Sequence, residues 1–284
     1  MQFPIIKNTT TASKLLIFLL LFVFGLIFSG ILGLLIPNLQ ITQICSQLVG
    51  FLMPPMLYVM LVKEEPFNYL GLNKLPKWSL LGILTMFTVI PFVALVSEWN
   101  DGITFPESMK VIETTFRNLK ELNDSTSEKM MNESNLFVAI VIFGFLAAVS
   151  EEILFRGVIQ QAFVKLFKNA HVGIIVTAFV FSAFHADFYG FFPRFILGLM
   201  LGYMFWMSGS IWASIIMHFT NNTTIVMLYF LNKKEIINID VESFGSTDSV
   251  FVIILSLVVT VIIFIICNRL KNRRDARPCV STRI

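Results

Sequence analysis

Long apolar segments run along almost the whole chain, separated by short polar stretches. A helix needs about 20 predominantly apolar residues to cross the hydrocarbon core of a bilayer, and we interpret eight segments as spans. They cover residues 15–37, 40–62, 80–96, 136–155, 172–185, 191–206, 211–231 and 250–267. The pattern predicts an all-α fold, a polytopic integral membrane helix bundle with about eight transmembrane helices.

The composition agrees with this fold class. Of the 284 residues, 56% are hydrophobic and 14% are charged, whereas about a quarter of the residues in a soluble domain are charged. The basic residues form no face or stripe outside the membrane flanks, so we expect the lipid bilayer as a partner and no nucleic acid. The cysteines Cys45, Cys267 and Cys279 lack the spacing of a metal site or a disulfide framework.

The longest polar stretch, residues 98–135, contains a segment at 109–122 for which we predict an amphipathic helix. This stretch separates the parts that we expect in the chain. They are N-terminal transmembrane helices with an extracytoplasmic loop, a central core, and a C-terminal transmembrane helix with a basic tail, at residues 1–134, 135–231 and 232–284.

The lysines and arginines between the spans predict the orientation. With eight spans both termini lie on one side, and that side receives Lys63, Lys74, Lys77, Lys165, Lys168, Arg269, Lys271, Arg273, Arg274 and Arg277. The other side keeps Lys110, Arg117, Lys120, Lys129, Lys233 and Lys234. Because cytoplasmic loops carry the excess of these residues, we expect both termini in the cytoplasm and the 98–135 loop outside. In a bacterium the membrane would be the plasma membrane.

Two adjacent carboxylates and an arginine lie inside, or at the lip of, the fourth span: Glu151, Glu152 and Arg156. Each ionised group there costs about 2.5–3.5 kcal/mol on insertion scales, which makes a functional site the default hypothesis. Glu152 and Arg156 share a helix face and can pair. Glu151 points about 100° away and is left for another task. A purely structural salt bridge between helices is the alternative.

His185 and His218 also lie within or at the ends of apolar segments, and Asn222 follows His218 by one helical turn. Helix lengths allow these groups and Glu151 to meet in one water-accessible cavity, which we expect in the cytoplasmic half of the bilayer. There a glutamate could activate water, and a histidine could share that role or bind a metal. A second histidine and an amide could stabilise an oxyanion. Because no Ser, Thr or Cys is clearly paired with a histidine, activated water fits better than an acyl-enzyme.

Three motifs carry a resemblance to a known family. EExxxR stands at 151–156, FxxxH at 181–185 and HxxxN at 218–222. In these motifs residues 135–230 resemble the CPBP family of intramembrane proteases, named for CAAX proteases and bacteriocin-processing proteins and also called Abi. The resemblance implies an all-helical membrane core and endopeptidase activity on a peptide or protein substrate that is lipid-modified or membrane-associated. Eukaryotic members remove the last three residues of prenylated CAAX proteins, and bacterial members are often tied to bacteriocin maturation or self-immunity.

Carried over by motif, the resemblance implies a role for each candidate residue. Glu151 would be the water-activating base with His185 beside it, and His218 with Asn222 would form the oxyanion site. Glu152 and Arg156 would complete the first motif as a structural pair. A metal is the open question: zinc held by Glu151, His185 and His218, or a metal-free mechanism. We favour the metal-free one, because Asn222 sits where a donor is useful and a zinc ligand is unusual, and we predict no other cofactor.

Two other classes of function remain open at this point. The first is a non-catalytic scaffold or immunity protein that keeps the fold and the site, against which the intact motifs argue. The second is a transporter, for which buried Glu, Arg and His are also typical. Against the transporter, the chain shows no pair of similar half-chains with broken helices.

Overall fold

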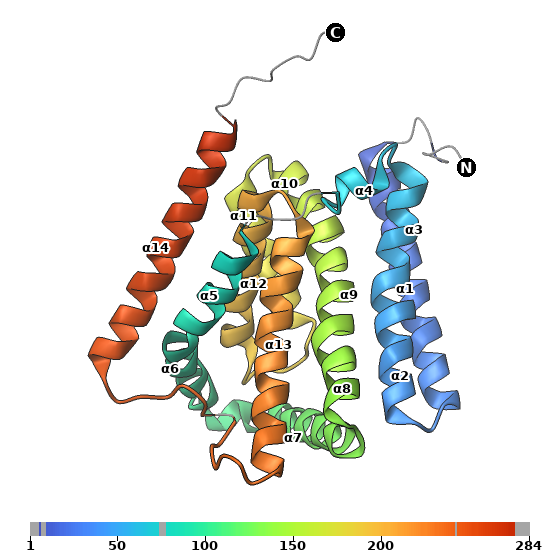
Figure 1. Cartoon of the computed structure of the whole chain (residues 1–284). Coiled ribbons are helices and arrows are strands. Elements are labelled where there is room, and N and C mark those ends of the chain that lie inside the picture. Colours follow the sequence, from blue (N-terminus) through green and yellow to red (C-terminus); the bar gives the residue numbers. More distant parts are fainter. Residues whose placement is uncertain (1–5, 7–9, 74–77, 242, 276–284) are drawn as a thin grey trace.

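The computed structural model describes residues 6, 10–73, 78–241 and 243–275, and every regular element in these ranges is a helix. Figure 1 shows a bundle of long, roughly parallel helices with α7 lying across one end. The first turn of α1 and the last turn of α14 lie at the opposite end. We call these the α7 end and the terminal end.

The N-terminal part is a pair of helical rods on one side of the bundle (Figure 1). The first rod is α1 (Thr11–Leu35), and the second is continuous from α2 (Leu39–Cys45) through the π-helix η1 (Ser46–Leu52) to α3 (Met53–Val62). Phe18 and Phe22 of α1 stack on each other, and Phe18 contacts Tyr58 edge-on. This aromatic contact holds the two rods together.

The next segment crosses the bundle with a bend. After α4 (Pro66–Tyr69), helices α5 (Ser79–Thr88) and α6 (Ile90–Asp101) meet at an angle of 50°. Pro91 lies in the first turn of α6, where the missing N–H of proline interrupts the helical hydrogen bonds of α5. A short 3₁₀ turn, η2 (Glu107–Met109), then leads into α7.

Helix α7 (Lys110–Glu133) confirms the amphipathic helix that the sequence predicts at 109–122 and extends beyond it. It is bound to the bundle by Arg117, whose guanidinium lies 4.1 Å from the centre of the Tyr189 ring. Lys110 donates a 3.1 Å hydrogen bond to Glu113, which lowers the pKa of that carboxyl group below its ordinary value. The polar face of α7 is thus stabilised by its own ion pairs.

One helix of 32 residues, Leu136–Phe167, forms the centre of the bundle. It consists of α8 (Leu136–Ala139), the π-helix η3 (Ile140–Leu146), α9 (Ala147–Leu154), the π-helix η4 (Phe155–Gln160) and α10 (Gln161–Phe167). At about 1.5 Å per residue it is longer than a hydrocarbon core is thick. The helix therefore continues to Phe167, beyond residue 155 where the sequence predicts the end of the fourth span.

Four helices complete the fold. They are α11 (Ala170–Ala183), α12 (Phe191–Ser208), α13 (Ile211–Lys233) and α14 (Val250–Asp275). Gly209 turns the chain between α12 and α13 at a φ of 68°, a left-handed conformation that suits glycine. Helix α14 is attached to the α5–α6 bend, where Ser256 Oγ donates to the Thr88 carbonyl at 2.6 Å.

The fold class predicted from the sequence, a helical membrane bundle, is confirmed. The count of eight spans is not confirmed. Among the described residues five helices are long and apolar enough to cross a membrane, or six if α5 and α6 form one bent span. Helix α11 has only 14 residues, and α13, whose centre carries His218 and Asn222, is not among those helices.

The predicted orientation in the membrane stays a prediction. Both outermost helix ends lie on one side of the bundle and α7 on the other (Figure 1), as eight crossings require. Lys74, Lys77, Arg277 and Cys279, which entered the sequence analysis, lie outside the described residues.

Candidate active site

Glu152 and Arg156 form an ion pair in the interior of the central helix. Arg156 Nη1 lies 2.8 Å from Glu152 Oε1, and both side chains are 0% exposed. Arg156 Nη2 also donates to the Gly198 carbonyl of α12 at 3.1 Å. The pairing predicted from the four-residue spacing is confirmed, and it also links the central helix to α12.

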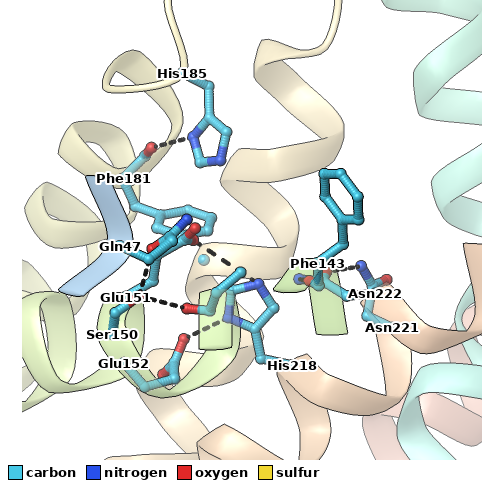
Figure 2. Close-up of polar contacts among 12 residues, drawn as sticks. Gln47, Phe143, Ser150, Glu151, Glu152, Phe181, His185, His218, Asn221 and Asn222 are labelled. Carbon is cyan, nitrogen blue, oxygen red and sulfur yellow. Dashed lines mark hydrogen bonds and ion pairs between the residues drawn. The ribbon is translucent and has the colours of Figure 1, made fainter. Parts of the chain in front are cut away.

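His218 of α13 joins this pair from the other side. Its Nδ1 lies 2.9 Å from Glu152 Oε1, the oxygen that also binds Arg156. Because a carboxylate accepts hydrogen bonds, Nδ1–H is the donor, and the second ring nitrogen points elsewhere. That nitrogen, Nε2, lies 3.9 Å from Glu151 Oε2. His218 therefore stands between the two glutamates, as Figure 2 shows.

Glu151 has different surroundings from its neighbour Glu152. Its side chain is 13% exposed and lines a cavity, whereas that of Glu152 is 0% exposed. The cause is the rotation of about 100° between consecutive helical residues. The distance of 3.9 Å between Glu151 Oε2 and His218 Nε2 is too long for a direct hydrogen bond and suits a contact bridged by water.

The second motif supplies Phe181 and His185. His185 follows the last turn of α11, where its Nδ1 donates to the Phe181 carbonyl at 2.9 Å. The Phe181 ring lies 4.7 Å from the Arg156 guanidinium and edge-on to both His185 and His218. The phenylalanine of the motif is thus the packing partner that the two histidines and the arginine share.

Asn222 lies one turn beyond His218. Its Nδ2 donates to the Phe143 carbonyl at 3.0 Å, and its Oδ1 accepts from Asn221 Nδ2 at 3.2 Å. Phe143 belongs to the π-helix η3, a type of segment that is rare and frequent at functional sites. An amide nitrogen carries two hydrogens, so Asn222 keeps one N–H beyond the bond to Phe143.

One cavity of about 350 Å³ brings the predicted residues of three motifs together: Glu151, His185, His218 and Asn222 line it. Glu152 and Arg156 are not in its lining and lie behind Glu151 and His218. The expectation that separate motifs meet around one cavity is confirmed. The structure does not test the role of each residue.

The cavity has polar lining residues that the sequence analysis missed, among them Ser97, Arg194 and Asn221. Arg194 is held by Asp187 Oδ2 at 2.7 Å, and Asp187 Oδ1 accepts from the backbone N–H groups of Tyr189 and Gly190. A signal for Arg194 was present, because it is the single charged residue in the apolar segment 191–206. The cost argument applied to Glu151 applies equally to it.

The three candidate zinc ligands are not grouped as a metal site in the part of the chain that the structure describes. The described residues contain no group of three or more His, Cys, Asp and Glu side chains that could hold a metal ion. Glu151, His185 and His218 border the same cavity without being arranged as such a group.

A comparison with known families matches the central part of the chain. Residues 133–224 match the family model described as type II CAAX prenyl endopeptidase Rce1-like. The resemblance to the CPBP family that the motifs indicate is confirmed over these residues. All six candidate residues lie inside the matched range, while α1–α6 and α14 lie outside it. No curated protein and no solved structure matches the chain. The match and the apolar helices indicate a multi-pass intramembrane endopeptidase whose substrates are peptides or proteins in membranes.

Proposed function

We propose that this protein hydrolyses a peptide bond with a water that Glu151 activates. The observation that carries the proposal is the difference between the two adjacent glutamates. One oxygen of Glu152 binds both Arg156 and His218 in a fully buried cluster. Glu151 lies in the cavity wall and faces His218 across 3.9 Å. Only Glu151 has the access to water that a general base requires.

In the first step Glu151 takes a proton from water while the water oxygen attacks the substrate carbonyl. Negative charge then develops on the carbonyl oxygen, and the Nε2 side of His218 and the remaining N–H of Asn222 stabilise it. In this role both ring nitrogens of His218 carry a hydrogen, because its Nδ1–H donates to Glu152 Oε1. Glu151 finally returns its proton to the leaving amine, and the products are a carboxylic acid and an amine, between which a proton then passes to give a carboxylate and an ammonium group.

The buried residues Glu152 and Arg156 position His218 and do not contact the substrate. Arg156 and Glu152 hold the Nδ1 side of His218, so that its Nε2 remains directed toward Glu151. His185, whose Nδ1 is bound to a backbone carbonyl, presents its other nitrogen for a contact with water or substrate. Because residues 133–224 match the model of CAAX prenyl endopeptidases, we propose a lipid-modified or otherwise membrane-associated peptide segment as the substrate.

The test is a peptidase assay on the purified protein in detergent, with a library of internally quenched peptides. Wild type should cleave at least one peptide, and Glu151→Gln should be slower by about a hundredfold or more, the usual scale for loss of a general base. Glu64→Gln, at an exposed position between α3 and α4, is the matched control and should retain the rate. Equal rates for wild type and Glu151→Gln would refute the proposal.

Two other outcomes would favour the alternative functions. An inactive wild type would favour the scaffold, and liposome flux that survives loss of Glu151 would favour the transporter.

The same preparation tests the metal-free preference. A chelator should leave the rate unchanged, and metal analysis of the active enzyme should find no stoichiometric zinc. One tightly bound zinc per chain, with activity lost to the chelator and restored by zinc, would overturn this part of the mechanism and would leave endopeptidase activity itself intact.

A further inference from the structure

The cavity around Glu151 contains one side chain with a permanent positive charge. Of the described residues that line it, Arg194 in the first turn of α12 is the only lysine or arginine. The proton transfers proposed above give this side chain no role. A charge in an apolar membrane segment is costly, and such a residue marks a functional site by default.

Arg194 is held in place by the turn that precedes α12. Its Nη1 donates to Asp187 Oδ2 at 2.7 Å, and Asp187 Oδ1 accepts from the backbone N–H groups of Tyr189 and Gly190. A Cβ on Gly190 would overlap the Arg194 guanidinium, so the absence of a side chain at this position makes room for it. The guanidinium is therefore oriented before a ligand binds, which lowers the entropic cost of binding.

The turn itself is fixed by a neighbouring helix and contains a strained residue. The side-chain amide of Asn100 in α6 donates to the Phe188 carbonyl and accepts from the Phe192 N–H, both at 3.0 Å. Ala186, directly before Asp187, has a φ of 50°, a left-handed conformation that is unfavourable for residues other than glycine. Strained backbone persists where the surrounding structure fixes it, and it is frequent at functional sites.

The ion pair presents its cation to the cavity. The side chain of Asp187 is 8% exposed and that of Arg194 is 34% exposed, and Arg194 lines the cavity whereas Asp187 does not. Arginine carries five side-chain N–H donors in a planar fork, and Arg194 bonds to the described part of the protein only through Nη1. Stability alone is a weak reason for such a pair, because apolar residues often serve as well. The remaining donors are therefore available to a ligand in the cavity.

We propose that Arg194 binds a carboxylate of the substrate. The inference rests on the proposed function and adds a specificity subsite to it. The fork of a guanidinium matches the two oxygens of a carboxylate, and peptides carry carboxylates at the C-terminus and on aspartate and glutamate. A second carboxylate in the cavity of Glu151 is unfavourable unless a cation faces it, because like charges repel. Arg194 thus selects peptides that place a carboxylate beside it while the scissile bond lies at Glu151.

Matched peptides test this subsite. A peptide that the purified wild type cleaves is compared with its C-terminal amide and with forms in which each aspartate or glutamate is exchanged for asparagine or glutamine. We expect removal of one carboxylate to lower kcat/KM by about ten- to a hundredfold, the scale of a hydrogen bond to a charged group. The exchange that does so identifies the source of the carboxylate. Undiminished rates for every neutral form would overturn the inference and leave the proposed function standing.

Arg194→Gln connects the preference to this residue. It should lose the same factor with the carboxylate peptide and cleave the neutral form about as fast as wild type does, so that the preference disappears. A purely structural role of Arg194 would lower both rates alike, and that result would overturn the inference. Lys233→Gln, which removes a cation outside the cavity lining, is the matched control and should keep the preference.

A double variant covers the case in which Arg194→Gln fails to fold because Asp187 loses its partner. Asp187→Asn/Arg194→Gln removes both charges and should show the same loss of preference. A double variant that still prefers the carboxylate peptide would overturn the inference.

Binding measures the subsite without turnover. Glu151→Gln protein is titrated with fluorescently labelled library peptides in carboxylate and neutral forms, and anisotropy gives the two Kd values. We expect the carboxylate form to bind at least about tenfold more tightly, and equal affinities would overturn the inference. If the purified wild type cleaves no peptide, the proposed function fails, whereas the binding preference still decides whether Arg194 holds a carboxylate.

Discussion

The two halves of the bundle are built from the same helices and differ in how they are filled. On the terminal side of the site, Glu152, Arg156 and Gln160 are buried among glycine contacts and backbone carbonyls. On the α7 side, the same central helix presents Glu151 to a cavity of about 350 Å³. We call the terminal side the packed half and the α7 side the hollow half. The packed half holds in place side chains that also face the cavity of the hollow half. Substitutions in the packed half should affect the stability of the protein, and substitutions in the hollow half should affect the rate of peptide hydrolysis.

Arg156→Ala should have the largest effect on stability. It leaves Glu152 buried at 0% exposure without its guanidinium partner, and breaking a buried pair in this way costs about 3–5 kcal/mol. Lys110→Ala, which removes a 57% exposed lysine from Glu113, is the control and should cost much less, because Glu113 keeps Arg117 at 3.7 Å. Denaturant unfolding in micelles measures both. A normally stable Arg156→Ala protein would show that the packed half does not depend on this pair.

His218→Ala should lower both the stability and the rate. One ring nitrogen of His218 contacts the buried Glu152, and the other faces Glu151 in the cavity wall. Loss of one oxyanion donor costs about 10²–10³ in rate, and Glu152 also loses a partner at 2.9 Å. His171→Ala is the matched control: His171 is exposed and bonds to Tyr203 Oη at 2.9 Å, away from the cavity wall of Glu151. Kinetics and thermal unfolding of both variants check this. A His218→Ala enzyme with the wild-type rate would remove His218 from the mechanism.

Asn222→Ala should lower the rate by about a hundredfold, the lower part of the range for one oxyanion donor, with a small loss of stability. The stability loss arises because the Phe143 carbonyl loses its 3.0 Å partner. Thr220→Ala, on the same helix but outside the cavity lining, is the control and should change the rate much less. If the two variants lose the same activity, the amide of Asn222 has no special position.

Gly202→Ala should have the smallest of these effects, confined to stability. An added Cβ would lie 2.8 Å from Gln160 Oε1 and 2.9 Å from Ile174 Cγ2, and overpacking of this kind costs about 1–3 kcal/mol. Gly30→Ala in α1, where a Cβ meets nothing within 4 Å, is the control and should be neutral. A Gly202→Ala protein as stable as wild type would mean that the packed half can rearrange.

Local rules predicted a large part of the site. The spacing of four residues gave the Glu152–Arg156 pair, and the helical rotation separated Glu151 from it. The contact of His218 with Glu152 could not be predicted, because it joins residues 66 positions apart through the packing of α13 on the central helix. Arg194 was visible as a charge in an apolar segment, but its partner Asp187 depends on the turn before α12.

The sequence predicted the fold class better than it predicted the bends of the helices and the packing of the linkers. Hydropathy located the apolar segments, but it does not measure whether a helix is long enough or straight. Helix α11 has 14 residues, as many as its predicted segment, and is one of the shorter apolar helices rather than a candidate span. The bend near Pro91, which the sequence analysis did not include, divides the third segment into α5 and α6. The position of the linker residues Val241 and Phe244 against the cavity follows from tertiary packing, for which the sequence gave no pattern.

The most direct test of the central claim compares the two adjacent glutamates in one experiment. Glu151→Gln and Glu152→Gln are purified side by side, and the peptidase rate and the unfolding temperature of each are measured. We predict that Glu151→Gln loses about a hundredfold or more in rate and unfolds at the wild-type temperature, whereas Glu152→Gln unfolds at a clearly lower temperature because Arg156 loses its buried partner. A Glu151→Gln protein that is active, or one that is unstable while Glu152→Gln is stable, would contradict the account.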